Sequence, residues 1–364
     1  MRVLMLSKAC IVGIYQPKLE AMAQEGVTLR VLVPPSWRDE RGTQALERVH
    51  THGYDLRVTP IRLNGNFHLH HYPQLGREIA NFKPDIVHID EEPYNLATWQ
   101  ALFHARRSGA KSLFFSWQNI LRHYPPPFAW GERWVLQHAD YALVGTESAG
   151  AVWRAKGYKG KMQTIPQFGT DTARFVPAPE RSARPFTIGY IGRMVEEKGV
   201  FVLLEAVAKL ASDWRLRLVG GGDALGALRA RVAELGLEAH VTFVGQLPST
   251  QVVAEYHKLD VLALPSLTRP NWKEQFGRVL VEAMACEIPV IGSDSGAIPD
   301  VIGDGGLVVR EGDANALAQA LDSLQADAHA CAQFGKAGRA RVLAHFTHAQ
   351  IARETVAVYR EMLS

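Results

Sequence analysis

The chain of 364 residues contains no long hydrophobic run, few cysteines and little excess charge. No apolar stretch approaches the roughly 20 residues that a membrane-spanning helix needs, so any membrane association is expected to be peripheral. The three cysteines are odd in number and have no metal-like spacing, which favours a reduced protein over a disulfide or zinc scaffold. A net charge of +3 is too small and too dispersed to indicate a partner such as nucleic acid.

The composition is that of an ordinary globular protein, with 47% hydrophobic and 21% charged residues. A chain of this length exceeds what one hydrophobic core usually organises, so two domains are expected. Residues 1–6 already have the pattern of a strand. We therefore expect no signal peptide and a cytoplasmic protein.

Short apolar runs alternate with helical patterns along both halves of the chain. The alternation predicts parallel sheets with crossover helices, and its restart near residue 187 predicts two doubly wound α/β domains. A turn-rich segment places their boundary near 175 to 183, and a last helix is predicted from about 347 to 362. Strands are predicted at residues 3–6, 27–33, 85–90, 112–116, 141–145, 187–192, 215–220, 241–245, 261–265, 289–293 and 306–309.

Two glutamates eight positions apart, Glu274 and Glu282, flank a turn at Phe276 and Gly277. If a helix begins at this turn, its free N–H groups and positive dipole end can receive a diphosphate. Glu282, about two turns along, can then accept hydrogen bonds from ribose hydroxyls, while Glu274 faces what is attached beyond the phosphates. The alternative is an amphipathic helix with two solvated glutamates, which the apolar neighbours of Glu282 disfavour.

A second group of candidates follows the strand predicted at residues 187–192. Arg193 and Lys198 lie on the loop at the carboxyl end of a parallel strand, where ligands of open α/β sheets bind. A guanidinium and an ammonium group can clamp a diphosphate between them. The alternative is that both side chains pair with Glu196 and Glu197 at the surface.

Together these motifs resemble those of the retaining GT-B glycosyltransferases, in particular the large family 4. The resemblance rests on the two glutamates with their Phe-Gly turn, on residues 289–291 and 296–302, and on a Gly-Arg-x4-Lys-Gly motif at 192–199. It implies two Rossmann-like domains that face each other across a cleft. The first, residues 1–175, binds the acceptor, the second, residues 183–344, binds the nucleotide sugar, and a helix at 345–364 packs back on the first.

The resemblance also implies roles for individual residues. Arg193 and Lys198 neutralise the leaving diphosphate and Glu274 contacts the donor sugar, so these three are the catalytic candidates. No divalent metal or other cofactor is expected, because the nucleotide sugar is a substrate. Main-chain groups near Leu247 read the nucleobase. The donor-binding candidates are Gly13, Gly192, Leu247, Gln275, Phe276, Gly277, Arg278, Val279 and Glu282.

The acceptor side is predicted at Asp90, Glu91 and Gln118. Asp90 and Glu91, with Glu92, follow a predicted strand, where grouped acids can bind an acceptor hydroxyl or a cationic acceptor and raise one another's pKa. The alternative is a solvated acidic loop. Gln118 stands where many family members carry a His near the anomeric carbon, and a Gln can hold a hydroxyl but cannot act as acid or base.

Two further segments of the first half are rich in ring side chains. His68, His70 and His71 lack the paired acids or cysteines of a metal site and are predicted to lie in a surface loop. The aromatic, proline-rich residues 119–130 either form an acceptor-binding loop or, with Arg133 and Trp134, touch a membrane.

The sequence therefore predicts a retaining, metal-independent transferase that moves a sugar from a UDP-sugar, or from a GDP-sugar, to an acceptor hydroxyl. The acceptor is expected to be a sugar or a lipid-linked molecule in cell-surface polysaccharide or glycolipid biosynthesis. Two alternatives stay open. One is a nucleotide-sugar 2-epimerase of the same GT-B shape, and the other is a non-catalytic nucleotide-sugar-binding relative.

Overall fold

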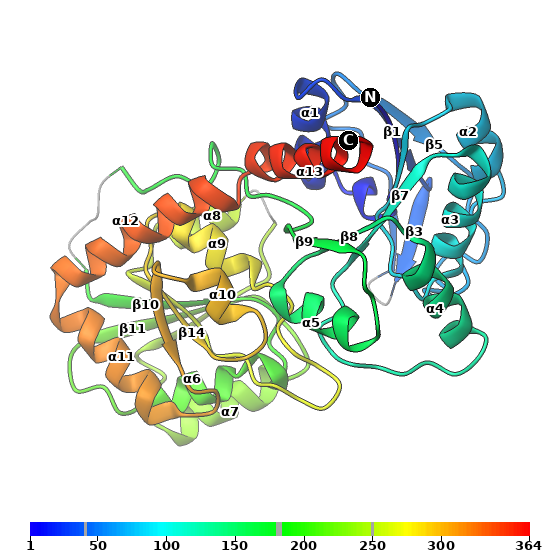
Figure 1. The fold of residues 1–364 in the computed structure, drawn as a ribbon. Coiled ribbons are helices and arrows are strands. Elements are labelled where there is room, and N and C mark those ends of the chain that lie inside the picture. Colours follow the sequence, from blue (N-terminus) through cyan, green and yellow to red (C-terminus); the bar gives the residue numbers. More distant parts are fainter. Residues whose placement is uncertain (40–41, 180–183, 249–250) are drawn as a thin grey trace. The chain divides into compact units, whose positions relative to one another are not determined.

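The computed structural model describes residues 1–39, 42–179, 184–248 and 251–364. The chain divides into two compact units, the first made of residues 1–169 and 348–364 and the second of residues 170–347. Each unit is built on its own parallel sheet (Figure 1). The predicted linker residues 181–183 lie outside the described residues.

In the described part of the first unit the main sheet has seven parallel strands in the order β5-β2-β1-β6-β7-β8-β9. The order changes direction between β1 and β6, which is where open α/β sheets bind ligands. A separate antiparallel hairpin joins β3 (Ser36–Asp39) to β4 (Gly42–Ala45). The main strands are β1 (Arg2–Leu6), β2 (Thr28–Val33), β5 (Asp55–Val58), β6 (Ile86–Ile89), β7 (Lys111–Ser116), β8 (Tyr141–Val144) and β9 (Lys161–Thr164).

Helices cover both faces of this sheet, and each face has its own hydrophobic core (Figure 1). One core joins the sheet to α2 (Leu75–Phe82), α3 (Leu96–Ser108), α4 (Phe128–His138) and α5 (Glu147–Ala155). The other joins it to α1 (Pro17–Gln24) and to the C-terminal helix α13 (His348–Leu363). Two short 3-10 helices, η1 (Ala9–Ile11) and η2 (Gly13–Tyr15), precede α1.

The C-terminal helix α13 is held in the first unit by an apolar face and by one buried polar contact. Ile351 and Val356 are fully buried in the core that α13 shares with α1. The hydroxyl of Tyr359 lies 2.6 Å from Nδ1 of His88 on the central strand β6. Burial lowers the pKa of His88, so a neutral ring faces this hydroxyl.

The described part of the second unit has a six-stranded parallel sheet in the order β12-β11-β10-β13-β14-β15, with the change of direction between β10 and β13. Its strands are β10 (Phe186–Ile191), β11 (Trp214–Val219), β12 (Val241–Gly245), β13 (Val261–Leu264), β14 (Val290–Ser293) and β15 (Gly306–Val309). Its helices are η3 (Glu196–Lys198), α6 (Val200–Val207), α7 (Leu225–Glu234), α8 (Val252–Tyr256), α9 (Arg278–Ala285), α10 (Ile298–Ile302), α11 (Ala314–Ala326) and α12 (Ala328–His345).

All strands that the apolar runs predict are present, and the α/β fold with two Rossmann-like units is confirmed. The sequence pattern does not predict β5 and β9. Both are edge strands with polar, partly exposed side chains, so they lack the apolar run that marks a central strand.

The two units divide between residues 169 and 170, earlier than the predicted 175 to 183. Phe175 is buried in the core of the second unit, and its ring meets that of Tyr256 edge to face with centroids 5.8 Å apart. The turn before the prolines therefore folds with the second unit and is not a free linker.

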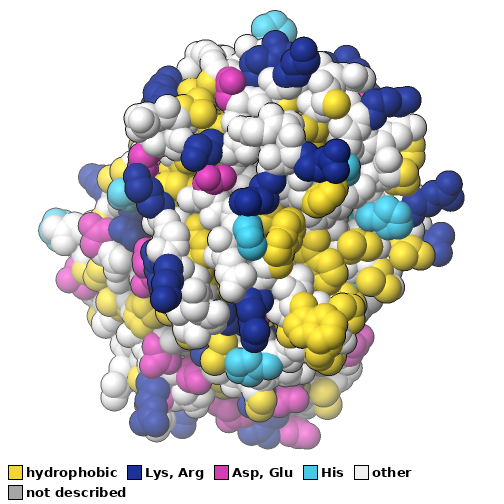
Figure 2. Space-filling view, turned by 45° about the vertical axis from the view of Figure 1, so that its right-hand side comes forward, with side chains coloured by type: hydrophobic (Ala, Val, Ile, Leu, Met, Phe, Trp, Pro, Cys, Tyr) yellow, Lys and Arg dark blue, Asp and Glu magenta, His cyan; other side chains and the backbone are white. Residues whose placement is uncertain are grey.

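Large hydrophobic side chains gather on one part of the face shown in Figure 2, among Lys, Arg and His side chains. Within the described ranges no helix is both long enough and apolar enough to span a membrane.

Candidate functional site

The carboxyl ends of β10 and β13 bring Lys198 and Glu274 together in the second unit. The Nζ of Lys198 lies 2.5 Å from Oε2 of Glu274, and the hydroxyl of Ser266 donates to the same oxygen at 2.9 Å. The Lys198 and Glu274 side chains are only 16% and 8% exposed, so water screens this ion pair weakly. An ammonium group and a carboxylate are thus held at the ligand-binding edge of the sheet.

The loop that carries Glu274 is pressed against the turn before α10. The carbonyl of Glu274 accepts a hydrogen bond from the N–H of Ala297 at 3.1 Å. Gly296, next to it, has a φ of +59°, and a Cβ at that position would lie 2.1 Å from the Glu274 carbonyl oxygen. Only glycine fits there, so this turn fixes the height of Glu274 above the sheet.

The helix α9 begins at Arg278, directly after Gly277, which confirms the predicted helix start. Gly277, the N-cap residue of α9, has φ +77° and ψ +53° and, as a glycine, offers no side chain to cap the first turn. Helix N-termini that lack a cap present N–H groups and a positive dipole end to an anion. Phe276 anchors the turn by packing edge to face on Phe346 at 5.7 Å.

Glu282 is the fifth residue of α9 and therefore lies just over one turn along the helix. The prediction of about two turns is wrong. The hydroxyl of Tyr256 donates to its Oε2 at 2.8 Å. Burial raises the pKa of Glu282, and the Tyr256 hydrogen bond and the charges of Arg278 and Arg174 oppose that rise. The alternative of two solvated glutamates is therefore wrong.

The other donor-side candidates lie around this pair with different degrees of burial. The Arg193 side chain is 55% exposed, and its guanidinium lies 3.9 Å from the carboxylate of Glu197. The alternative of pairing at the surface is therefore correct for Arg193, but not for Lys198, which pairs with Glu274. Gly192 donates its N–H to the carbonyl of Val219 in the neighbouring strand. Leu247 follows the edge strand β12, two strands from β10, and is partly buried against the core.

Three members of the α9 turn also differ in exposure. The side chains of Gln275 and Arg278 are exposed, whereas that of Val279 is partly buried. The carbonyl of Val279 accepts a hydrogen bond from Tyr256 at 3.3 Å. Tyr256 thus bridges the first turn of α9 and the carboxylate of Glu282.

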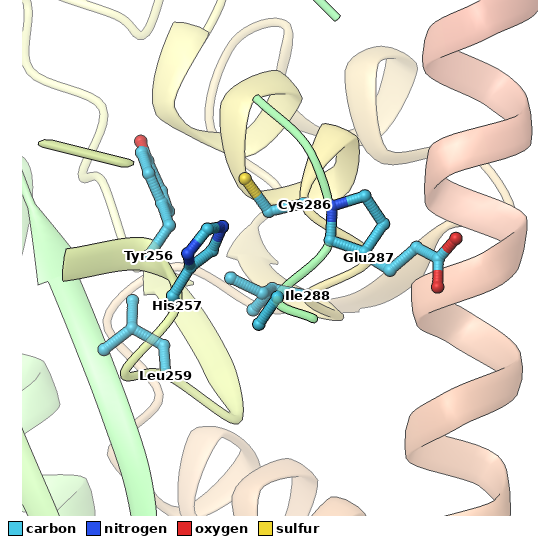
Figure 3. Close-up of a pocket in the computed structure, with 8 residues that line it drawn as sticks. Tyr256, His257, Leu259, Cys286, Glu287 and Ile288 are labelled. Carbon is cyan, nitrogen blue, oxygen red and sulfur yellow. The ribbon is translucent and has the colours of Figure 1, made fainter. Parts of the chain in front are cut away.

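A pocket of about 80 Å³ lies at the opposite end of the same sheet, where β13 and β14 begin (Figure 3). Figure 3 shows Tyr256 and His257 on one side and Cys286, Glu287 and Ile288 on the other. Lys198 and Glu274 follow the carboxyl ends of the strands, so this pocket is separate from the candidate site. Tyr256 is the residue common to both regions.

The first unit places a second Lys-Glu pair where its own sheet changes direction. Lys8 follows β1 and Glu91 follows β6, and their side chains form an ion pair that is 15% and 0% exposed. His70 Nε2 lies 3.6 Å from the same Glu91 oxygen, and Asn95 donates to it at 3.3 Å. Burial opposes the charge of Glu91, but Lys8 and then His70 outweigh it and lower its pKa to about 2.

Asp90 is embedded in a separate set of buried contacts. It accepts hydrogen bonds from the Ser7 hydroxyl at 2.5 Å and from Gln167 Nε2 at 2.9 Å. Lys18, also buried, donates to the Gln167 carbonyl at 2.9 Å. Burial raises the pKa of Asp90, and the Lys18 charge opposes that rise.

Glu92 points toward the end of β7. Its two oxygens accept hydrogen bonds from the Ser116 hydroxyl at 2.5 Å and the Trp117 N–H at 2.8 Å, and burial raises its pKa to about 7. The alternative of a solvated acidic loop is thus wrong. Repulsion from Glu91 contributes to the raised pKa of Asp90 and of Glu92, as predicted. Burial is the larger effect for Asp90 and Glu92, and Glu91 shifts the other way.

Gln118 is buried beside this cluster. Its backbone N–H donates to Ser116 at 3.0 Å and its Nε2 donates to the carbonyl of Ile120 at 3.0 Å. Its Oε1 is buried and finds no donor among the described residues. A buried acceptor without a donor is costly, so this oxygen is suited to take a hydrogen bond from a hydroxyl.

Gly13, a predicted donor-binding residue, is in contact with other residues of the first unit. The N–H donates to the Glu47 carboxylate at 2.7 Å. A Cβ on Gly13 would lie 2.5 Å from a Val49 methyl group, so neighbouring residues of the first unit fill this space.

Lys8, His70 and Tyr256 were not predicted as residues of a functional site. His70 is fully buried beside Glu91, so the prediction of a surface loop is wrong for it. Lys8 carried the same signal as Lys198, a basic residue just after a strand at the point where the sheet changes direction. The contacts of His70 and Tyr256 join residues 21 and 26 positions apart, and no local pattern marks them.

Comparison with known proteins agrees with this architecture. A "Glycosyl transferase 4-like domain" family model matches residues 17–167, and "Glycosyl transferases group 1" matches residues 172–341. The GDP-mannose-dependent alpha-(1-6)-phosphatidylinositol monomannoside mannosyltransferase of Mycolicibacterium smegmatis is 34% identical over 51% of this chain and 52% of its own length. The putative colanic acid biosynthesis glycosyltransferase WcaL of Escherichia coli is 30% identical, over 67% and 61%. The chain thus spans between half and two thirds of the length of these relatives.

Solved structures show the same fold. The HepE protein of Anabaena in complex with UDP superposes with a TM-score of 0.73 at 18% identity, covering 99% of this chain and 100% of that one. A sucrose-phosphate synthase from Thermosynechococcus elongatus gives a TM-score of 0.74 at 22% identity, covering 100% and 99%. The chain belongs to the GT-B glycosyltransferases, with a family 4-like first domain and a group 1 second domain.

Proposed function

We propose that this protein transfers a sugar from a nucleoside diphosphate sugar to an acceptor hydroxyl, with retention of the anomeric configuration and without a metal ion. The observation that carries the proposal is the largely buried pair of Lys198 and Glu274, four residues before the start of α9, whose N-cap residue is a glycine. An ammonium group and free N–H groups together suit a diphosphate. Glu274, held by Lys198 and Ser266, is placed to orient the sugar beyond it.

The rate enhancement in this proposal comes from electrostatics and orientation. Lys198, the α9 N-terminus and Arg193 stabilise the charge that develops on the departing diphosphate. Glu282 accepts hydrogen bonds from the ribose, with Tyr256 fixing one of its oxygens. The departing phosphate takes the proton of the acceptor hydroxyl, so Gln118 only needs to hold that hydroxyl and not to act as a base.

The proposed donor and acceptor classes are based on the similar proteins. We favour a UDP-sugar over a GDP-sugar as donor, in line with the similarly folded HepE of Anabaena, whose crystal structure is a complex with UDP, while the M. smegmatis relative is named for GDP-mannose. The relatives named for colanic acid and for a phosphatidylinositol mannoside support an acceptor in cell-surface polysaccharide or glycolipid synthesis. We place the reaction in the cytoplasm, with peripheral contact to a membrane.

The test combines nucleotide binding with product analysis. A nucleotide at a hundredfold excess over its Kd should stabilise the fold by about 2.7 kcal/mol, so a thermal-shift panel with UDP, GDP and ADP, with and without EDTA, identifies the base. The matching sugar conjugate is then incubated with glycan acceptors, and NMR reads the anomeric configuration of the product. An inverted product or an EDTA-sensitive reaction contradicts the proposal. Acceptor-independent epimerisation at sugar carbon 2 supports the epimerase, and binding without turnover supports a non-catalytic protein.

Tyr256→Phe is expected to weaken nucleotide binding about tenfold and to leave kcat nearly unchanged. The variant removes the hydroxyl that donates to Glu282, so the buried carboxylate is less well fixed and its pKa rises further. Calorimetric titration of the nucleotide between pH 6 and 8 measures the effect, which should grow as the pH falls. The matched control is Tyr158→Phe in the first unit, which also loses a buried hydroxyl, one that donates to the carbonyl of Lys161. Equal Kd values for both variants would contradict the role of Tyr256.

A further inference from the structure

The loop that carries Gln118 follows β7 and is fixed by the carboxylate of Glu92. The Ser116 hydroxyl donates to Oε2 of Glu92 at 2.5 Å and accepts a hydrogen bond from the backbone N–H of Gln118 at 3.0 Å. Oε1 of Glu92 accepts a hydrogen bond from the backbone N–H of Trp117 at 2.8 Å. Hydrogen bonds to a carboxylate are stronger than those between neutral groups. One charged side chain thus holds the two residues that precede Gln118.

A second contact holds the ring of Trp117. Its indole N–H donates to Oε1 of Gln167 at 2.7 Å, and Nε2 of Gln167 donates to Oδ1 of Asp90 at 2.9 Å. The ring also packs closely on Gly145, where a Cβ would lie 2.1 Å from the nearest ring atom. The ring is therefore confined by a hydrogen bond and by close packing, so the loop after β7 is held at its backbone and at a side chain.

Gln118 keeps one side-chain atom for a further hydrogen bond. Its Nε2 donates to the carbonyl of Ile120 at 3.0 Å, whereas its Oε1 is buried and finds no donor among the described residues. A buried acceptor without a donor is costly, and the hydroxyl of a ligand can remove that cost. The direction of Oε1 depends on the backbone of Gln118, which is joined through Ser116 to Glu92.

We propose that Glu92 is a positioning residue: it holds the loop after β7 so that the amide oxygen of Gln118 accepts a hydrogen bond from the acceptor hydroxyl. Asp90 supports the same loop through Gln167 and Trp117. This role rests on the proposed function and deepens it, because the acids then orient the group that binds the acceptor and do not bind the acceptor themselves. A binding group is held precisely only when the residues around it are themselves fixed by packing and hydrogen bonds.

The charge of Glu92 is expected to change near neutral pH. Burial raises its pKa to about 7, its two hydrogen bonds and the charge of Lys8 oppose that rise, and the charge of Glu91 adds to it. Tyr94 and Tyr124 also lie close enough to interact with this carboxylate, and burial raises the pKa of both hydroxyls, so both stay neutral in this range. As the pH falls from 8 to 6, the carboxylate gains a proton and its hydrogen bonds to the loop weaken.

The first test follows the side-chain amide signals of Gln118 by NMR, in the full chain without nucleotide sugar or acceptor. Gln118→Ala assigns these signals by their loss. In the unchanged protein they should shift between pH 6 and 8, with a midpoint at about 7. In Glu92→Gln, whose amide does not titrate, the transition should disappear. Ser116→Ala keeps the carboxylate but removes the hydroxyl that joins it to Gln118, so the shift should be about twofold smaller.

The second test is kinetic and uses the methyl glycosides of glucose, galactose and mannose as acceptor probes. Glu92→Gln should raise the acceptor KM about fivefold at pH 8 and less than about twofold at pH 6, where Glu92 of the unchanged protein is itself mostly protonated. The donor KM should stay unchanged. A residue that serves stability alone would produce neither this difference between acceptor and donor nor its dependence on pH.

The matched control is Glu132→Gln, which removes another buried carboxylate of the first unit. That carboxylate pairs with Lys156 at 2.6 Å, and burial raises its pKa as well. The control should leave the Gln118 titration and the acceptor KM unchanged. Thermal unfolding shows whether each variant is folded.

The proposal would be overturned by Gln118 signals that do not titrate, or that titrate equally in Glu92→Gln and in the unchanged protein. Equal kinetic effects of Glu92→Gln and of Glu132→Gln would also overturn it. The NMR titration needs no substrate, so a lack of transfer to every probe counts against the proposed function. The titration still decides whether Glu92 positions Gln118.

Discussion

Lys198→Ala is expected to lower kcat for sugar transfer about 100- to 1000-fold, with a much smaller change in donor KM. The ammonium group of Lys198 is preorganised by Glu274 in a weakly screened position, and its attraction to the diphosphate grows as the sugar-phosphate bond breaks. Steady-state kinetics with a labelled donor measure both parameters. The exposed Lys209 of the second unit is the control, and Lys209→Ala should stay within about twofold of the unchanged enzyme.

The same substitution leaves Glu274 buried without its cation, which by itself is expected to cost roughly 3 kcal/mol of folding free energy. The double variant Lys198→Ala/Glu274→Gln also removes the Glu274 charge and should recover most of the stability. Its kcat should stay low. Recovery of turnover together with stability would show that Lys198 serves the fold alone, and would contradict its catalytic role.

Lys8→Met is expected to destabilise the first unit by about 3 kcal/mol at pH 7, because it removes the ammonium group that pairs with the fully buried carboxylate of Glu91. Urea unfolding followed by hydrogen exchange of the β1 and β6 amides assigns the loss to this unit. Lys111→Met is the control, because the Lys111 side chain is 51% exposed and its ion pair with Asp140 should contribute below about 1 kcal/mol. A loss equal to that of the control would show that Glu91 is not charged in the fold.

The pH dependence gives the same pair a second readout. The pKa of Glu91 falls from 4.5 to about 2 on folding, so its contribution is fully present above pH 4.5 and is lost as the pH falls toward 2. That contribution amounts to about 3 kcal/mol. Glu91→Gln should therefore flatten the dependence of unfolding free energy on pH between 4.5 and 2. An unchanged slope in that interval would contradict the pairing.

The regular elements could be predicted from the sequence because central strands of parallel sheets are buried on both faces and read as apolar runs. β6 and β13 are fully buried, and both were found. Lys198 and Glu274 could be predicted because each stands next to a strand or helix end that the local pattern marks. Their contact with each other could not, because it joins residues 76 positions apart.

For the candidate acceptor residues of the first unit, the residues could be predicted but their surroundings could not. The cluster of Asp90, Glu91 and Glu92 was found, but not its burial, because nothing near residue 91 in the sequence reveals that Lys8 and His70 fold against it. Burial is the larger cause of the raised pKa values of Asp90 and Glu92, and the charge of Lys8 lowers that of Glu91, so a pattern of adjacent acids reveals only the smaller contribution. Long-range partners are the information that local periodicity lacks.

Both chain ends belong to the first unit, and the second unit is an insertion in its sequence. The two crossing points lie side by side, since the N–H of Thr170 donates to the carbonyl of Phe346 at 2.7 Å and Thr170 bridges to Thr347. A fragment that stops at residue 169 would lack α13, so the apolar side chains of the first unit that pack on α13 would be exposed to solvent. Excising residues 170–347 and joining the cut ends through a few glycines would keep α13, so the first unit could be studied as a minimal protein on its own.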